Sequence, residues 1–270
     1  MIHGARILVV GFGNMGSALV EGFLDKGIAP EHMTVLDKAD SAKAKAKTLG
    51  VSLIRSPQDL AHKPQFIILA VKPQVMDVVV PEYAHLTSEG VCFISVAAGQ
   101  TLKKLQGYLG ASARIVRAMP NTPASVGAGV TVLCATSNLA VEQMAVAETL
   151  FGCVGEALWL EDESLMDAVT AVSGSGPAYF FLMMEALEAA GVEQGLPADV
   201  ARRLAVHTAY GAGKLAAHHI GDTSSAELRI AVTSPGGTTE AGLNALTQGG
   251  LVGLVGKAVT AATRRGKELS

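Results

Sequence analysis

Cysteine is scarce in this sequence, which has only three in 270 residues. Cys92, Cys134 and Cys153 are far apart and stand among apolar residues. This usage argues against a disulfide framework and is typical of buried thiols in a reducing compartment. The apolar run at residues 5–11 is too short for the core of a signal peptide and leads directly into glycines, so no such peptide is expected. These features predict a cytoplasmic protein.

An excess of one charge and long apolar runs are also missing. The 21 basic and 24 acidic side chains give a net charge of −3. Both signs are mixed along the chain, so no extended basic surface is expected to bind nucleic acid. Apolar stretches are interrupted well before the roughly 20 residues that a membrane-spanning helix requires. We therefore expect neither a nucleic-acid partner nor a membrane role.

Spacings that would bind a metal ion are absent as well. His218 and His219 are adjacent in the sequence. On a helix they point roughly 100° apart and cannot bind one metal ion as an i, i+4 pair does. Surface positions are the simpler interpretation, and we expect no metal site.

Hydrophobic residues make up 49% of the chain, which also has 30 glycines, a composition that suits a folded α/β protein. Strand patterns alternate with helical patterns at residues 7–10, 14–27, 33–36, 41–50, 66–71 and 90–99. This alternation predicts a parallel sheet with right-handed crossovers. Further strands are expected within residues 113–123, 127–135 and 157–160, with a helix at 138–151.

Only helical patterns remain from about Ser164 onward. We therefore predict an α/β domain at residues 1–160 and an all-α domain at residues 161–270. Residues 177–187 read PAYFFLMMEAL and are apolar on nearly all sides, as in a helix that is buried on most sides. One small bundle would not cover such a helix, so burial against a second subunit is expected.

The glycine turn near the N-terminus has the pattern G-x-G-x-x-G, with Gly11, Gly13 and Gly16 placed between a strand and a helix. The first glycine permits a tight turn, the second lets a pyrophosphate approach the backbone, and the third lets the helix pack on the strand. The positive end of the helix favours the diphosphate. This context predicts a Rossmann-type N-terminal domain that binds a dinucleotide.

The 2′ group of the dinucleotide is not decided by the residues that follow the second strand. Asp37 stands about twenty residues past Gly16, where an acidic side chain holds a ribose 2′-hydroxyl, as in NAD. Lys38 follows directly, with Ser41 and Lys43 nearby, and these side chains could receive a 2′-phosphate instead. The coenzyme is therefore expected to be NADPH or NADH.

Two later strand ends carry small residues, LAVKPQ at residues 69–74 and SVAAG at residues 95–99. Open α/β sheets bind ligands at this edge, and the alanines would let a nicotinamide ribose come close. From position alone, ordinary strand exits explain these segments equally well.

Two glycine-rich stretches in the helical half, residues 173–179 and 233–243, each precede a helical run. Pro177 suits the first helical position, and Thr238 or Thr239 could cap the second helix. Free N–H groups at such a helix start form an anion site. Plain helix capping is the alternative, although it does not explain two successive glycines after a proline.

The blocks GFGNMGSAL, AVKPQ, RAMPNTPA, VSGSGPAY and SPGGTTEAGL occur in this order and spacing in pyrroline-5-carboxylate reductases, and nearly the whole chain resembles this family. The resemblance implies hydride transfer from NADH or NADPH to the C=N bond of 1-pyrroline-5-carboxylate, which gives L-proline in the last step of proline biosynthesis. It also implies a helical C-terminal domain that interlocks with a partner subunit, as a homodimer or a ring of dimers.

The resemblance also implies roles for individual residues. The expected coenzyme-binding residues are Gly11, Phe12, Gly13, Asn14, Met15, Gly16, Ala70, Val71, Lys72, Pro73, Ala97 and Ala98, with Asn121 next to the nicotinamide. The expected substrate-binding residues are Ser173, Gly174, Ser175 and Gly176 on one wall, and Gly236, Gly237 and Thr238 on the SPGGTT loop. Thr239 and Ser234 on the same loop are the expected catalytic residues.

Asp222 aligns by spacing with an acidic position near the family's substrate pocket. Its segment, HHIGDTSSAEL, departs from the more usual HPGEL-like sequence, which leaves its local geometry open. The resemblance and the spacing together place Asp222 among the candidate substrate contacts.

An iminium is already electrophilic, so orientation over the nicotinamide supplies much of the expected catalysis. If the imine binds neutral, Thr239 or a water is expected to deliver the proton to nitrogen. Lys72 is interpreted as a coenzyme contact or a solvated lysine, and Arg117 as an anion ligand or a structural salt bridge. Two other functions remain open: a β-hydroxyacid dehydrogenase, with Lys214 as its lysine, and a non-catalytic dinucleotide-binding regulator.

Overall fold

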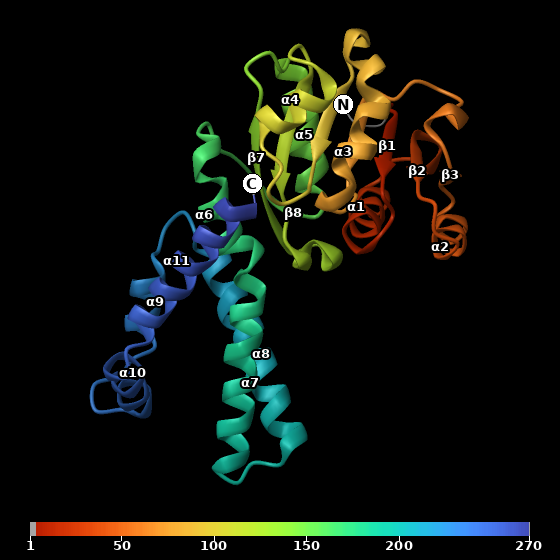
Figure 1. Ribbon diagram of the computed structural model, residues 1–270. Helices are drawn as coiled ribbons and strands as arrows, with labels where there is room; N and C mark the ends of the chain where they lie inside the picture. The colour runs from red at the N-terminus through yellow and green to blue at the C-terminus, as the bar shows by residue number, and fades with distance from the viewer. Residues whose placement is uncertain (1–3, 270) are drawn as a thin grey trace. The chain divides into compact units, whose positions relative to one another are not determined.

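The structure is a computed structural model that describes residues 4–269, and the chain divides into two compact units (Figure 1). The first comprises residues 1–175 together with 262–270, and the second comprises residues 176–261. The change from mixed to purely helical structure follows residue 159, whereas the first compact unit continues to Ser175.

An eight-stranded sheet forms the centre of the first unit, in the order β3-β2-β1-β4-β5-β6-β7-β8. Its strands are β1 (Ile7–Val10), β2 (Met33–Leu36), β3 (Ser52–Ile54), β4 (Phe66–Leu69), β5 (Cys92–Ser95), β6 (Arg114–Met119), β7 (Gly129–Ala135) and β8 (Gly155–Trp159). The order reverses at β1, which lies between β2 and β4. Ligands of open α/β sheets bind at such a switch point, beyond the carboxyl ends of the strands.

The predicted parallel pairing is confirmed for β1, β2, β4 and β5. The direction of the later strands was not predicted, and β6 and β7 run antiparallel. A 3-10 turn, η5 (Thr122–Val126), and a few flanking residues join them. A parallel partner needs a crossover of a dozen or more residues, so this short link forces the chain to reverse. β8 pairs parallel to β7 and therefore shares its direction.

The central strands are buried on both faces, as their unbroken apolar sequences require. β1, β4 and β5 are buried at every position. Val9 and Phe23 belong to the core on one face, while Leu8, Tyr83 and Phe93 belong to the core on the other. Each large side chain buried in this way contributes about 1.5–3 kcal/mol.

Helices and short helical turns connect these strands. The α-helices of the first unit are α1 (Asn14–Asp25), α2 (Ser41–Leu49), α3 (Met76–Val79), α4 (Leu102–Leu109), α5 (Val141–Gly152) and α6 (Met166–Val169). The 3-10 turns besides η5 are η1 (Pro30–His32), η2 (Pro57–Asp59), η3 (Pro73–Val75), η4 (Val80–Glu89) and η6 (Glu163–Leu165). A π-helical turn, η7 (Thr170–Gly174), follows α6 and is of the kind found frequently at functional sites.

The second unit contains α7 (Gly176–Glu193), α8 (Ala198–His218), α9 (Ser225–Ala231), α10 (Thr238–Gln248) and the first part of α11 (Leu251–Leu269). The long helices α7 and α8 lie side by side (Figure 1), where Gly191 leaves room for Ala201. Large apolar side chains nevertheless remain exposed on α7 and α8, including Phe180, Phe181, Leu182, Leu204 and Tyr210. Phe180 is 67% exposed in the single chain.

Among residues 4–269 no helix is both long enough and apolar enough to cross a membrane. The three cysteines are free; Cys92 and Cys134 are buried, and Cys153 is partly buried. Within the same described residues, no group of three or more His, Cys, Asp or Glu side chains is arranged to hold a metal ion.

Candidate active site

The glycine turn follows β1, and its first and third glycines are fixed by close packing. Gly11 has a φ of +95°, and a Cβ there would lie 2.7 Å from the Ala70 carbonyl oxygen at the end of β4. A Cβ at Gly16 would overlap the Gly11 carbonyl oxygen. Only glycine fits these two positions, so the ends of β1, β4 and α1 meet.

The second glycine of the turn faces open space. A Cβ at Gly13 would meet no atom within 4 Å. Gly13 is also the N-cap of α1, and no side chain caps the helix there. The start of α1 can therefore receive a diphosphate on its N–H groups. Beside this first turn lies a cavity of about 390 Å³, whose lining includes Asn14, Met15, Lys45 and Thr122.

Asp37 lies directly after β2 and is joined to the glycine turn. Its Oδ2 accepts a hydrogen bond from the Phe12 N–H at 2.7 Å, and its Oδ1 accepts one from the Ala39 N–H at 2.8 Å. The carboxylate is thereby fixed in orientation at the place where a Rossmann domain binds the adenosine ribose. Each oxygen retains a lone pair for a ribose hydroxyl.

Arg55, which the sequence analysis missed, organises the loop that carries Asp37 and Lys38. Its guanidinium donates to the carbonyl oxygens of Asp37 and Ala39 at 2.9 Å each, and it pairs with Asp40 at 3.3 Å. Lys38 is exposed on this loop. The loop at which the ribose is expected thus carries one oriented carboxylate and two cationic side chains.

The exits of β4 and β5 continue the same edge of the sheet. The Ala70 N–H donates to the Val10 carbonyl oxygen at 2.8 Å, and the Val96 N–H donates to the Leu69 carbonyl oxygen at 3.1 Å. Ala97 is buried, whereas Ala98 is exposed. Next to them, Val71 is partly buried, and Lys72 and Pro73 are exposed at the start of η3. These residues come together with the glycine turn because their strands are parallel neighbours.

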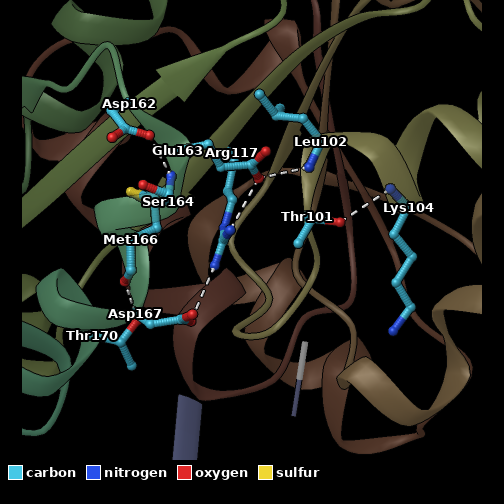
Figure 2. Close-up of polar contacts among 10 residues, drawn as sticks. All are labelled: Thr101, Leu102, Lys104, Arg117, Asp162, Glu163, Ser164, Met166, Asp167 and Thr170. Carbon is cyan, nitrogen blue, oxygen red and sulfur yellow. Dashed lines mark hydrogen bonds and ion pairs between the residues drawn. The ribbon is translucent and has the colours of Figure 1, made fainter. Parts of the chain in front are cut away.

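Arg117 forms a buried salt bridge, which decides between the two interpretations of this residue. Its Nη1 lies 3.0 Å from Glu163 Oε1, and its Nη2 lies 4.0 Å from Asp167 Oδ1 (Figure 2). The same Glu163 oxygen accepts the Leu102 N–H at 2.7 Å. Arg117 therefore holds the Glu163 carboxylate that binds the first N–H of α4.

Asp162 stands beside this network and caps η6. Its Oδ1 accepts the Ser164 N–H at 2.8 Å (Figure 2). Hydrogen bonds from Ser164 hold the pKa of the Asp162 carboxyl below its usual range. The turn that presents Glu163 is thus fixed at its own start.

Asn121 fixes the segment that carries Ser173. Its Nδ2 donates to the Ser173 carbonyl oxygen at 3.1 Å, and its Oδ1 accepts the Val130 N–H at 2.9 Å. A Cβ at Gly174 would lie 2.6 Å from Met119 Cε, so the end of the Met119 side chain packs directly on this glycine. The Ser175 N–H donates to Thr170 within the π-helical turn. Contact of Asn121 with a nicotinamide stays a prediction; its side-chain amide binds these two backbone groups.

The SPGGTT loop belongs to the second unit and leads into α10. Gly236 has a φ of +71°, and its N–H donates to Glu240 Oε2 at 2.7 Å. The Gly237 N–H donates to the Ser234 carbonyl oxygen at 3.0 Å. The prediction that Thr238 or Thr239 caps this helix is wrong, because Gly237 is the N-cap and α10 begins at Thr238. Both threonines are exposed in the first turn.

Two of the remaining predicted substrate residues lie apart from this loop in the sequence. Gly176 is buried at the start of α7. Asp222 is exposed in the turn between α8 and α9, where its N–H donates to the His219 carbonyl oxygen at 3.0 Å. Substrate contact by either residue stays a prediction.

Comparisons with known proteins agree along the whole chain. Residues 163–269 match the family described as pyrroline-5-carboxylate reductase dimerisation, and residues 6–99 match NADP oxidoreductase coenzyme F420-dependent. The chain is 39% identical over 266 residues to pyrroline-5-carboxylate reductase of Pseudomonas aeruginosa, covering 98% of this chain and 97% of that one. It is 40% identical over 288 residues to the enzyme of Mycobacterium tuberculosis, with coverage of 98% and 97%.

Solved structures give the same result. The pyrroline-5-carboxylate reductase of Coxiella burnetii superposes with a TM-score of 0.94 at 38% identity, covering 99% of each chain. The pyrroline carboxylate reductase of Plasmodium falciparum, solved with NADP bound, gives a TM-score of 0.86 at 29% identity, with coverage of 100% of this chain and 99% of that one.

Proposed function

The chain belongs to the pyrroline-5-carboxylate reductase family, and we propose that it reduces the C=N bond of 1-pyrroline-5-carboxylate with NAD(P)H to give L-proline. It is an NAD(P)H-dependent oxidoreductase that acts on a CH–NH group. Apart from the similarity to known reductases, the observation that supports the proposal is the start of α1, which no side chain caps. Gly13 there faces open space, and the oriented carboxylate of Asp37 is bonded to the same turn.

The residues of the first unit fit the coenzyme chemically. The N–H groups at the start of α1 would hold the diphosphate, and Asp37 would accept a ribose hydroxyl. Ala70 and Ala97 are small enough for close approach of the nicotinamide ribose. NAD(P)H, when bound, supplies the hydride for the imine carbon. The chain's residues fix the geometry in which the transfer occurs.

The SPGGTT loop is proposed to bind the substrate carboxylate at the start of α10. The N–H groups of Thr238 and Thr239 occupy the first helical positions, which favour an anion. The predicted use of the Gly236 and Gly237 N–H groups would require substrate to displace their present acceptors, Glu240 and Ser234. The N–H groups of the helix start need no such exchange.

Proton delivery completes the proposed reaction. The product gains one hydride on carbon and one proton on nitrogen. If the imine binds neutral, the Thr239 hydroxyl or a water donates that proton, and Ser234 shapes the turn that presents Thr239. Ser173, Gly174 and Ser175 are proposed to form a wall of the substrate site, which Asn121 and Met119 hold in place.

Residues 1–160 are proposed to bind the coenzyme, and residues 161–270 to carry the substrate loop and the subunit contact. The separate family matches to residues 6–99 and 163–269 support this division. The dimerisation match indicates an oligomer, and exposed Phe180 and Phe181 support burial by a second copy. We propose a homodimer or a ring of dimers in a reducing, cytoplasmic setting, in keeping with three free cysteines.

A hydroxyacid dehydrogenase would need a catalytic lysine in the helical half. Lys214 on α8 instead lies over the Tyr210 ring, with its Nζ 5.9 Å from the ring centroid. The curated relatives support the reductase. We therefore do not favour the dehydrogenase.

The test is oxidation of NADH and of NADPH in the presence of DL-pyrroline-5-carboxylate, measured as the loss of absorbance of the reduced nicotinamide. Turnover is expected, and the ratio of the two kcat/KM values gives the coenzyme preference. Folded protein that binds coenzyme but turns over neither mixture would contradict the proposal and support a non-catalytic regulator. A panel of hydroxyacids would then test the dehydrogenase alternative.

A further inference from the structure

Glu240 is a charged residue of the SPGGTT region for which the proposed reaction has no role. It occupies the third position of α10, and its carboxylate reaches back to the Gly236 N–H at 2.7 Å. In α9 the third-position Glu227 instead binds the N-cap residue, Ser224, in an ordinary capping box. In α10 the N-cap is a glycine, and the glutamate binds one residue further back.

The loop that Glu240 holds has little else to fix it. No atom lies within 4 Å of a Cβ built at Gly236, so side-chain packing does not hold this residue. Its φ of +71° is one that glycine adopts freely but also leaves freely. The Gly236 N–H donates to Glu240 and the Gly237 N–H donates to Ser234, while the Gly237 carbonyl oxygen accepts the Ala241 N–H of the first helical turn.

The conformation of this loop determines where the first N–H groups of α10 point. Gly237 is the N-cap, so a change at Gly236 would move the peptide that presents Thr238. Thr238 and Thr239 are exposed, whereas Glu240 is partly buried against the turn. Glu240 is thus placed to order the Thr238 and Thr239 N–H groups, while its own carboxylate accepts the Gly236 N–H instead.

We propose that Glu240 is a positioning residue that holds Gly236 and so presents the Thr238 and Thr239 N–H groups to the substrate carboxylate. This inference rests on the proposed function. The hydrogen-bond acceptor matters in this role, whereas the negative charge works against binding of a second carboxylate. The two contributions separate in the pair Glu240→Ala and Glu240→Gln.

The experiment measures KM for pyrroline-5-carboxylate, KM for coenzyme and kcat in both variants. Glu240→Ala is expected to raise KM for pyrroline-5-carboxylate about five- to tenfold, the effect of losing one hydrogen bond of ordinary strength. KM for coenzyme is expected to stay within about twofold. Glu240→Gln retains an acceptor oxygen and is expected to keep KM for pyrroline-5-carboxylate at or below that of the wild type.

Glu227→Ala is the matched control, because it removes a third-position carboxylate from the neighbouring helix α9. It is expected to leave KM for pyrroline-5-carboxylate unchanged. An unchanged KM in Glu240→Ala overturns the proposal. A lowered KM in both Glu240 variants also overturns it and makes the glutamate a competitor of the substrate. An equal rise in KM for pyrroline-5-carboxylate in both Glu240 variants also overturns the proposal, because it would show that the negative charge of Glu240, and not its hydrogen-bond acceptor, supports binding.

Hydrogen exchange separates this inference from the reductase assignment, because it needs no turnover. A peptide that spans residues 233–241 is expected to exchange faster in Glu240→Ala than in the wild type, with Glu240→Gln close to the wild type. Equal exchange in all three proteins would show that Glu240 does not hold the loop at Gly236, even if the enzyme is active. Absence of turnover in the wild type instead counts against the reductase assignment. The exchange rates would still show whether Glu240 orders the loop.

Discussion

The Asp37 carboxylate accepts the Phe12 N–H at 2.7 Å and so joins the end of β2 to the glycine turn that follows β1. One side chain thereby connects the proposed ribose site to the proposed diphosphate site. A coenzyme bound at the proposed ribose site therefore contacts the same carboxylate that orders the backbone of the proposed diphosphate site. Substitution at Asp37 is therefore expected to affect both coenzyme affinity and coenzyme choice.

Asp37→Ala is predicted to raise the ratio of kcat/KM for NADPH to that for NADH by about tenfold, or about 1.4 kcal/mol. The change removes an acceptor for the 2′-hydroxyl and a negative charge near any 2′-phosphate. Steady-state kinetics with the two coenzymes measure the ratio. Asp40→Ala, on the same loop but highly exposed, is the control. An unchanged ratio in Asp37→Ala would show that this carboxylate does not face the 2′ group.

Gly16→Ala and Gly13→Ala are predicted to fail in different ways. A Cβ at Gly16 overlaps the Gly11 carbonyl oxygen, so Gly16→Ala is expected to cost about 1–3 kcal/mol of unfolding free energy. A Cβ at Gly13 meets nothing, so Gly13→Ala is expected to keep the wild-type Tm and to weaken coenzyme binding. Thermal melts and coenzyme titrations measure the two effects. Full coenzyme affinity in Gly13→Ala would place the diphosphate elsewhere.

Arg117→Met is predicted to lower the unfolding free energy by about 3 kcal/mol, because it leaves Glu163 without its buried partner. Urea unfolding of the single variants and of Arg117→Met with Glu163→Met measures the coupling. The double variant is expected to be more stable than the sum of the single losses predicts. Strict additivity would mean that the two side chains do not interact.

Thr239→Val is predicted to reduce kcat by about 100-fold and to change its pH profile, if the hydroxyl donates the proton to the ring nitrogen. Thr238→Val, which removes the neighbouring hydroxyl, is the comparison and is expected to retain more activity. Both backbone N–H groups remain in either variant, so substrate binding is expected to persist. An unchanged kcat and pH profile in Thr239→Val would assign the proton to water.

The thiols are predicted to react in two classes with a disulfide reagent. Burial raises the pKa of the Cys92 thiol to about 12 and that of Cys134 to about 11, so both are expected to react only after unfolding. Cys153 is partly buried and is expected to react in the folded protein, although burial raises its pKa also. Fast labelling of Cys92 in native protein would contradict its burial.

The raised pKa values of the Cys92 and Cys134 thiols also predict that the free energy of unfolding decreases at alkaline pH. Above roughly pH 8.5 the unfolded chain loses thiol protons that the folded chain retains, so the folded state binds more protons and the unfolding free energy decreases as pH rises. Urea unfolding between pH 8 and pH 10 measures the slope. A variant with Cys92→Ala and Cys134→Ala is expected to show a shallower slope, and an equal slope would assign the effect to other groups.

The sequence predicted well wherever one local pattern determines the structure. The apolar run of β4 and the glycine that ends α2 are examples, since Gly50 adopts a φ of +70° as a helix C-cap. The direction of β7 was not predicted, because it depends on the length of the link from β6. β3 was missed because its three residues are only partly buried or exposed, and so leave a weak pattern.

The candidate site was predicted less fully, because hydrogen bonds between distant residues leave no periodic trace. The side chain of Asn121, which is expected beside the nicotinamide, also donates to Ser173 and accepts from Val130, and these two contacts were not predicted. Arg55 was missed for this reason, since it donates to the Asp37 carbonyl oxygen, 18 residues earlier in the chain. Glu240 was missed although its partner Gly236 is only four residues away, because the contact lies one residue beyond the spacing of a capping box. The glycine at position 236 was the one available signal for Glu240, because a glycine turn without packing needs a tether.

Helix α11 starts in the second unit, and its last residues belong to the first. There Leu269 lies against Gly99, and Gly266 lies against Asp167. The helical unit is therefore an insertion with two covalent attachments rather than an appendage with one. A single proteolytic cut in the loop between α7 and α8 would leave two fragments that each retain part of the Rossmann unit, so cleavage alone would not release the helical unit.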